Sequence, residues 1–139
     1  MSLYVFDTDT LSLYRHGHAA VVQHTLTHPP EALAVTVITV EDQLSGWYAL
    51  LRRAKTLADI ASIYDHLAET VTFLSRTRIL SFTESAINHY EQLRPLKLRI
   101  GTMDLPIAAI TLAHNAILVT RNQQDFQLIP GLGIEDWTV

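Results

Sequence analysis

The chain has 139 residues, enough for one domain with a buried core. Its residues are 48% hydrophobic and 17% charged, which excludes a disordered chain, and no apolar run approaches the roughly 20 residues that span a bilayer. There is no cysteine, which excludes disulfides and thiolate metal sites and fits a cytoplasmic protein. The net charge of −4 argues against broad electrostatic binding of nucleic acid, unless metal ions over an acidic centre reverse the local sign.

The first third of the chain alternates between apolar runs and helical patterns. Residues 3–6 predict a strand, and Asp7 or Thr8 then caps a helix that ends at Gly17. A second short helix is expected over residues 19–27, because two prolines follow it directly.

A second strand and a long helix come next. Residues 33–38 predict the strand, and Thr39 is expected to cap a helix that reaches about Ala54. Glu41 and Asp42 then fall in the first turn of that helix, where acidic side chains interact favourably with the helix dipole.

Helical periodicity is clearest over residues 56–75, where apolar side chains recur every three and four positions. A third strand is expected over residues 79–82, and a helix then runs from residue 83 to a limit at Pro95. Another helix begins at Asp104 and leads into a short strand over residues 117–119, whose apolar side chains are typical of a strand buried on both faces.

A short edge strand over residues 134–139 completes the pattern. Because strands alternate with helices along the whole chain, we expect a parallel sheet covered on both faces. The predicted fold class is therefore α/β, a three-layer α/β/α arrangement with a short parallel central sheet, formed by one domain over residues 1–139.

Four acidic residues occupy comparable places in this pattern, after a strand or at a helix start: Asp7, Glu41, Asp104 and Asp125. Ligands of open α/β sheets bind outside the carboxyl ends of the strands, so we expect these carboxylates to converge at that edge. Asp104 joins them on the assumption that its helix begins at the same edge. Each acid alone is also an ordinary helix-capping residue, and it is the joint pattern that favours a site.

Carboxylates packed together without partners raise each other's pKa values, and a hard divalent cation relieves this repulsion. Mg²⁺ and Mn²⁺ prefer oxygen ligands, and either ion can activate water and stabilise charge on a phosphodiester. The sequence contains no cysteine and no Gly-x-Ser-x-Gly segment, so it offers no signature of a covalent nucleophile.

Several motifs extend this pattern along the chain. They are Leu-Tyr-Val-Phe-Asp-Thr-Asp-Thr-Leu-Ser at residues 3–12, Thr-Val-Glu at residues 39–41, Asp104 followed by Ile107-Ala108-Ala109, Leu-Val-Thr-Arg-Asn-Gln-Gln-Asp-Phe at residues 118–126, and Pro-Gly-Leu and Glu-Asp-Trp at residues 130–132 and 135–137. In their order and spacing they resemble a PIN-domain ribonuclease of the VapC toxin type, over essentially the whole chain.

The resemblance implies a PIN-like fold and a metal-dependent endoribonuclease that is the toxin of a toxin–antitoxin pair. Its partners would be an RNA substrate and a cognate antitoxin protein, and a homodimer is expected. The acidic set maps onto Asp7, Glu41, Asp104 and Asp125, with Thr120 and Asn122 as supporting polar groups. Asp7, Glu41 and Asp104 would then hold one Mg²⁺ or Mn²⁺, and Asp125 would help to place a second ion or the attacking water.

Two departures from the family pattern bear on the site. The first motif reads Asp-Thr-Asp where relatives often have Asp-Thr-Asn, so Asp9 adds a carboxylate near the centre. The position of Asn122 is acidic in some relatives, which leaves two residues, Asn122 and Asp125, as candidates to complete the ligand set.

Other polar residues have ordinary explanations beside functional ones. His24 and His28 stand four residues apart, but no third zinc ligand accompanies them, so a packing or surface role is expected. The basic residues of the second half are expected to form a solvated face, and the alternative is that one of them steers RNA phosphate: Arg94, Lys97, Arg99 and Arg121.

Six apolar side chains of the two long helices are expected to pack as core: Trp47, Tyr48, Leu51, Ile60, Tyr64 and Leu67. The alternative is that they form a groove for an antitoxin helix or a homodimer face. Two rival functions also remain: a receiver-like module that binds Mg²⁺ and accepts a phosphoryl group, and a non-catalytic PIN-like domain kept for protein binding.

Overall fold

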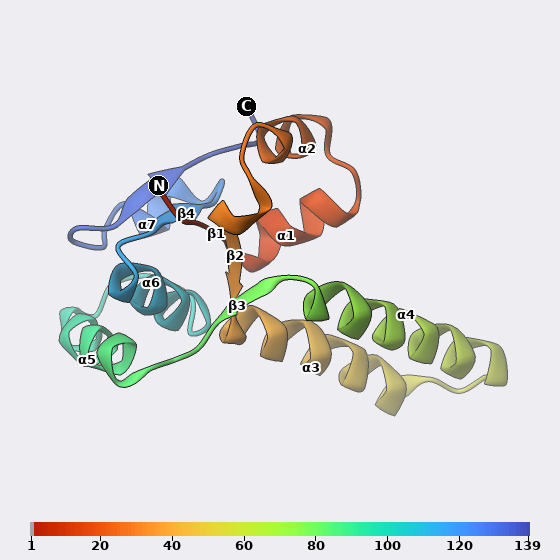
Figure 1. Ribbon diagram of the computed structural model, residues 1–139. Coiled ribbons are helices and arrows are strands. Elements are labelled where there is room, and N and C mark those ends of the chain that lie inside the picture. Colours follow the sequence, from red (N-terminus) through yellow and green to blue (C-terminus); the bar gives the residue numbers. More distant parts are fainter. Residues whose placement is uncertain (1) are drawn as a thin grey trace.

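A parallel sheet forms the centre of the molecule (Figure 1). The computed structural model describes residues 2–139, and within them five strands pair in the order β3-β2-β1-β4-β5, with every pairing parallel. The strands are β1 (Tyr4–Phe6), β2 (Leu33–Thr36), β3 (Arg78–Leu80), β4 (Ile117–Val119) and β5 (Gly133–Glu135). The short parallel sheet predicted from the alternating pattern is therefore confirmed.

Helices connect these strands and cover both faces of the sheet. They are α1 (Thr8–Arg15), α2 (Ala19–Leu26), α3 (Val37–Arg53), α4 (Leu57–Ser75), α5 (Glu84–Leu93), α6 (Asp104–Ala113) and α7 (Gln123–Phe126), with short 3₁₀ turns η1 (Pro30–Ala32) and η2 (Arg94–Leu96). Side chains of the residue types that favour helix starts cap four of them: Asp7 for α1, Thr36 for α3, Thr56 for α4 and Thr83 for α5. Within residues 2–139, no helix is long and apolar enough to cross a membrane.

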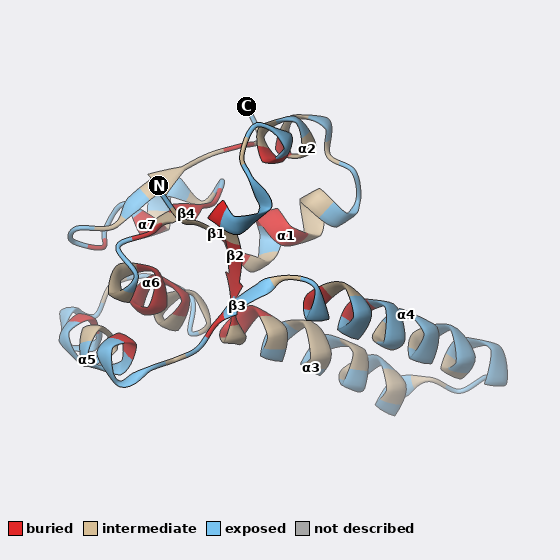
Figure 2. Cartoon of the chain, in the orientation of Figure 1, coloured by how far each residue is buried: buried red, intermediate tan, exposed pale blue. Residues whose placement is uncertain are grey.

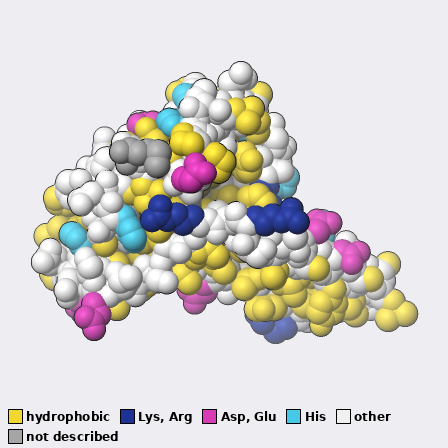
Figure 3. Space-filling view, in the orientation of Figure 1, with side chains coloured by type: hydrophobic (Ala, Val, Ile, Leu, Met, Phe, Trp, Pro, Cys, Tyr) yellow, Lys and Arg dark blue, Asp and Glu magenta, His cyan; other side chains and the backbone are white. Residues whose placement is uncertain are grey.

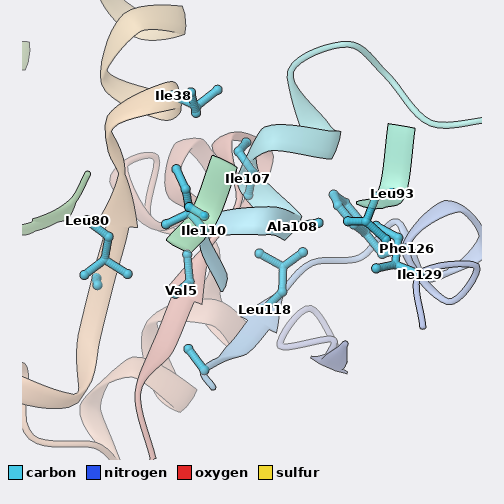
Figure 4. Close-up of a cluster of buried hydrophobic side chains, with 13 residues drawn as sticks. Val5, Ile38, Leu80, Leu93, Ile107, Ala108, Ile110, Leu118, Phe126 and Ile129 are labelled. Carbon is cyan, nitrogen blue, oxygen red and sulfur yellow. The ribbon is translucent and has the colours of Figure 1, made fainter. Parts of the chain in front are cut away.

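The strands bury both of their faces, as parallel strands between helices do. Val5 and Leu118 belong to a hydrophobic cluster with residues of α5, α6 and α7 (Figure 4). Their neighbours Phe6 and Val119 point the other way, into a second cluster with residues of α1, α2 and the end of α4. The alternation follows from the period-two geometry of a strand, and it gives the three-layer arrangement that the sequence predicts.

The α3–α4 hairpin extends away from the sheet (Figures 1 and 2). Within α4 only Thr70 and Leu74 are buried, and Tyr48 of α3 and Tyr64 of α4 are 46% and 56% exposed. Figure 3 shows hydrophobic side chains gathered over this hairpin. The expectation that these residues pack as core is wrong, because the hairpin projects beyond the layers that would cover it.

Strand β2 is two residues shorter than predicted, and this shifts the helix that follows. Thr36 ends the strand and caps α3, since its hydroxyl accepts a hydrogen bond from the Thr39 backbone N–H at 3.3 Å. Thr39 is therefore inside the helix, and Glu41 and Asp42 are beyond its first turn. Both threonines are suitable caps by residue type, so local sequence does not choose between them.

The two histidines of the first third have the packing role expected of them. The rings of His24 and His28 stack on Trp137 at centroid distances of 5.5 and 5.0 Å. The buried indole also donates a hydrogen bond from Nε1 to the Glu135 side chain at 2.9 Å. The stacking on His24 fastens the segment after β5 to α2.

Candidate active site

Two neighbouring strands bring the candidate residues together at the carboxyl edge of the sheet. Strands β1 and β4 pair in register, with Phe6 opposite Val119. Just beyond them, the Asp7 backbone N–H and the Thr10 hydroxyl both donate to the Val119 carbonyl, at 3.2 and 3.0 Å. These bonds tie the start of α1 to the end of β4 and so fix the position of Asp7.

Asp7 is both a helix cap and a buried carboxylate. One of its oxygens accepts a hydrogen bond from the Thr10 backbone N–H at 2.8 Å, and the residue is only 5% exposed. Burial raises the pKa of Asp7, with a smaller contribution from the charge of Asp9, while hydrogen bonds from Thr120 and Thr10 oppose the rise. Asp7 therefore does cap α1, but its burial makes the ionised carboxylate costly.

Asp104 is different, because it makes no capping hydrogen bond. It is the first residue of α6, and the cap position belongs to Met103, whose side chain makes no such bond. Gly101 passes close by: a Cβ on it would lie 3.3 Å from a carboxylate oxygen of Asp104, a close approach that glycine permits. Helix capping therefore does not account for an acid at this position.

The electrostatic surroundings of Asp104 identify its neighbours. Its pKa is raised, first by burial and then by the charges of Asp7, Asp125 and Asp42. These three carboxylates come from the start of α1, from α7 and from α3. Charges from elements far apart in sequence thus act on one half-buried acid, which is the arrangement that a cation would relieve.

A pocket of about 460 Å³ opens between the start of α1, the start of α6 and the segment after β4. It is lined by Asp7, Thr8, Asp9, Ser12, Asp104, Arg121 and Asn122. Helix α6 therefore begins at the same edge as the segments that follow β1 and β4, as the sequence argument assumed for Asp104.

The residues after β4 form a short chain of hydrogen bonds behind this pocket. The Thr120 hydroxyl accepts from the Asn122 backbone N–H at 3.0 Å, and the Asn122 side-chain amide donates to Asp125 at 3.1 Å. Asn122 lines the pocket. Asp125 does not line it, but it is hydrogen-bonded to Asn122 and its charge raises the pKa of Asp104. The two candidates for the last ligand position are thus one hydrogen-bonded unit.

The structure does not bring Glu41 into this group. Glu41 is exposed, it does not line the pocket, and it is not among the charges that raise the pKa of Asp104. Its neighbour Asp42 is among them.

Helix geometry explains why the charge of Asp42, and not that of Glu41, acts on Asp104. The Thr39 and Thr8 hydroxyls are hydrogen-bonded at 3.0 Å, so the face of α3 that carries Thr39 lies against the start of α1. A residue three positions later shares that face, and a residue two positions later does not. The signal that could have identified Asp42 is the cap at Thr36, which sets the phase of the helix.

Asp9, the extra carboxylate of the first motif, is engaged with Arg121. The Nε and a terminal nitrogen of the guanidinium donate to the two carboxylate oxygens at 2.6 and 3.2 Å. Both side chains line the pocket, and they are 47% (Asp9) and 52% (Arg121) exposed. Of the four basic residues considered for steering RNA, Arg121 is the one that lines this pocket, while Arg94 pairs with Glu91 on α5.

The donor set fits a hard divalent cation that keeps part of its water shell. Within residues 2–139, no group of three or more His, Asp or Glu side chains is arranged to hold a metal ion by itself. Mg²⁺, however, is commonly bound through one or two carboxylates together with waters and substrate phosphates. Asp7 and Asp104 present such oxygens to one pocket, and their raised pKa values show that the ionised forms lack compensation.

A second cavity, of about 590 Å³, lies between α1, β2 and α4. Its walls are mostly apolar, with Phe6, Leu11 and Phe73 among them, and Arg76 and Arg78 also line it. It contains none of the predicted acidic residues, so it is not a second copy of the acidic site.

Comparisons with known proteins show which sequences and folds the chain resembles. No family model matches the chain. "Ribonuclease VapC2" of Rickettsia felis is 42% identical over 69 residues, which are 47% of this chain and 52% of the relative. The "tRNA(fMet)-specific endonuclease VapC" of Salmonella typhimurium is 36% identical over 76 residues, 52% of this chain and 58% of the relative. The match therefore spans little more than half the length of these curated relatives.

A structural likeness covers the whole fold. The crystal structure of VapBC2 from Rickettsia felis, bound to a DNA fragment from its promoter, matches with a TM-score of 0.71 and 28% identity over 97% of this chain and 98% of that chain. The predicted resemblance to VapC-type PIN-domain proteins and the predicted α/β PIN-like fold are thus both confirmed.

Proposed function

We propose that the chain, which has the sequence motifs and the fold of the VapC-type PIN-domain proteins, is a divalent-metal-dependent endoribonuclease. The observation that carries the proposal is the position of Asp104 in the pocket lining, where it makes no capping hydrogen bond and the charges of Asp7, Asp42 and Asp125 act on it. The ribonuclease and tRNA endonuclease relatives support RNA as the substrate class.

In this proposal Asp7 and Asp104 hold the ion, Mg²⁺ or Mn²⁺, directly. Asp42 and Asp125, whose charges act on Asp104, would add negative charge near the ion. A bound divalent ion supplies Lewis-acid chemistry that stabilises the charge developing on a phosphodiester attacked by water. Thr120 holds Asp7 by a hydrogen bond, and Asn122 holds Asp125, so both supporting groups keep carboxylates in position.

The proposal replaces Glu41 by Asp42 in the acidic set. The pair offers a matched comparison, because both residues lie beyond the first turn of α3 and both are exposed. Replacing either carboxylate by its amide changes the charge equally. We therefore expect Asp42→Asn to reduce metal-dependent cleavage strongly and Glu41→Gln to leave it nearly unchanged.

The test is cleavage of purified RNA, including tRNA, by the purified protein in Mn²⁺ or Mg²⁺, with EDTA as the metal-free control. We expect Asp7→Asn and Asp104→Asn to reduce the rate by at least about a hundredfold, because each removes a charge that positions the ion. Asparagine caps a helix as well as aspartate does, so Asp7→Asn tests the charge without removing the cap. Cleavage that persists in EDTA, or in both variants, would show that another nuclease is responsible and would refute the proposal.

Calorimetric titration with Mn²⁺ separates the enzyme from a non-catalytic PIN-like domain. A protein that binds neither Mn²⁺ nor RNA would be a degenerate member of the fold, whereas Mn²⁺ binding without RNA cleavage would favour a receiver-like module. The Asp104→Asn variant is the control for site-specific binding.

We also propose that the chain pairs with a cognate antitoxin protein through the α3–α4 hairpin. The Rickettsia felis relative was solved as a VapBC2 assembly, and the hairpin exposes apolar side chains that its own fold leaves uncovered: Tyr48, Leu50, Leu57, Tyr64 and Val71. Exposed apolar surface of this kind marks a protein interface. The test is the molar mass in solution, measured by light scattering for the chain alone and with the product of an adjacent small gene. A dimer of the chain alone would assign the hairpin to the homodimer instead.

A further inference from the structure

The pocket is lined by one positively charged side chain, Arg121, which the proposed metal site does not use. Among its lining residues, Arg121 alone is basic, and it lies two residues after β4, at the edge where Asp7 follows β1. Phe6 and Val119 pair in register, so the residues after these strands face one another. Arg121 therefore comes just beyond the paired ends of β1 and β4, in the bend before α7, and its contact with Asp9 places its guanidinium beside the carboxylates.

The contact between Asp9 and Arg121 is bidentate. Two guanidinium nitrogens donate to two carboxylate oxygens, at 2.6 and 3.2 Å. A guanidinium presents the same fork to a phosphate, and its planar geometry suits both anions. The position that Asp9 occupies on Arg121 is thus one that a phosphate of the substrate could occupy.

The exposure of the pair makes such an exchange possible. Asp9 and Arg121 are 47% and 52% exposed, and ion pairs open to water contribute little to stability. The pair does not hold two buried elements together, because backbone and Thr10 hydrogen bonds already tie α1 to β4. Opening it therefore costs the fold little.

The negative charge of the pocket means that a bound phosphate needs a positively charged partner. A phosphodiester brings a negative charge to a site lined by Asp7, Asp9 and Asp104, which repel it. A guanidinium at the rim offsets that repulsion for the one phosphate that lies next to it. While Asp9 occupies the guanidinium, the same group is unavailable to RNA.

We infer that Arg121 is the phosphate-binding residue of the RNA site and that Asp9 holds its guanidinium until an RNA phosphate displaces the carboxylate. The inference rests on the proposed function, since it names the residue that receives the RNA backbone. Asp9 is then a positioning residue that competes with substrate, and not a ligand of the metal ion.

The test measures RNA binding apart from cleavage. Fluorescence anisotropy of a short labelled single-stranded RNA is followed in EDTA, at low and at rising salt, with each variant checked for folding by circular dichroism. The Glu91–Arg94 pair provides matched controls, since it too is a half-exposed ion pair, with a nitrogen–oxygen distance of 3.0 Å, and it joins the end of α5 to the start of η2, outside the pocket.

Loss of Arg121 should weaken binding in a way that loss of Arg94 does not. We expect Arg121→Gln to raise the Kd for RNA about tenfold, as loss of a charge-assisted hydrogen bond does. The slope of log Kd against log salt should fall by about 0.7, the value for one phosphate contact on single-stranded nucleic acid. Arg94→Gln should change neither quantity, and Arg121→Lys, which keeps the charge without the fork, should keep the salt slope and bind with intermediate affinity.

Loss of Asp9 should strengthen binding. We expect Asp9→Asn to lower the Kd about threefold, the scale of an exposed ion pair, while Glu91→Gln leaves it unchanged. The inference is overturned when Arg121→Gln binds RNA as Arg94→Gln does, or when Asp9→Asn binds no more tightly than Glu91→Gln.

The failure of this inference can be told apart from the failure of the proposed function. A wild-type protein that cleaves RNA in Mn²⁺, with an Arg121→Gln variant of unchanged affinity, would refute the role of Arg121 alone. A wild-type protein that neither binds nor cleaves RNA would refute both.

Discussion

The hydroxyl of Thr39 joins α3 to α1, and its removal offers a sharp test of how the site is assembled. Thr39 is fully buried, and its hydroxyl is hydrogen-bonded to that of Thr8 at 3.0 Å. Asp42 lies one turn further along the same face of α3. The Thr39→Val substitution keeps the branched shape of the side chain and removes only the polar contact.

The expected cost in stability is small and can be bounded. One intramolecular hydrogen bond contributes about 1 kcal/mol to the free energy of unfolding. Thr8 is only partly buried, so its hydroxyl can bind water in the variant and is not left unsatisfied. A change of this size should lower the Tm of a chain of this length by roughly 4 °C.

The expected cost in activity is larger, because catalysis depends on position more steeply than stability does. Loosening the start of α3 shifts Asp42 relative to Asp104, and a displacement near 1 Å can lower a rate by about a hundredfold. We therefore expect Thr39→Val to lower the metal-dependent cleavage rate at least about tenfold, and Thr39→Ser, which keeps the hydroxyl, to restore most of it.

Thr25→Val is the matched control. Thr25 is also buried, and its hydroxyl donates to the Val21 carbonyl within α2 at 2.8 Å, away from the acidic pocket. The two valine variants should lose similar stability in thermal unfolding, but only Thr39→Val should lose activity beyond its folded fraction. Equal activity in the two variants would refute the argument that this contact aligns α3 with the site.

Further predictions concern stability, metal and the C-terminal segment. Burial raises the pKa values of Asp7 and Asp104, so the stability that these groups contribute is full at low pH and is lost as the pH rises through their raised pKa values. In metal-free protein at neutral pH, Asp7→Asn and Asp104→Asn should therefore raise the Tm, an effect that should vanish in acid. Mn²⁺ at a hundred times its Kd should stabilise the wild-type protein by about 2.7 kcal/mol in thermal unfolding, and Asp104→Asn should abolish most of that shift. Trp137→Ala should lower the free energy of unfolding, measured in urea, by about 3–5 kcal/mol, since the buried ring stacks on His24 and His28, while Trp137→Phe should cost less.

Local sequence was sufficient wherever one physical signal dominated. The apolar run at residues 117–119 coincides with β4, because a parallel strand buried on both faces needs little besides β-branched and aliphatic side chains. The long periodic helix begins after Thr56 and ends at Ser75 as predicted, since its caps and its spacing agree. The alternation of strands and helices was enough to predict the fold class.

Local sequence was ambiguous where two residues met the same requirement. Thr36 and Thr39 are both good caps, and the strand stops at the first of them because the pairing of β2 with β3 ends where Thr36 meets Leu80. With the cap at Thr36, Thr39 lies inside the helix against Thr8. The charge of Asp42, three residues after Thr39, acts on Asp104.

The sequence by itself determined most of the helices and strands, the parallel sheet and the presence of acidic residues near strand ends, since these follow from periodicity and capping over a few neighbouring positions. It did not predict α7. Only the tertiary structure decided which of those acids meet. The partnership of Asp9 with Arg121 spans 112 positions along the chain, and no local pattern encodes it. The exposure of the α3–α4 hairpin was likewise beyond the sequence, because an apolar stripe shows that a helix face seeks cover but not whether its own chain supplies that cover.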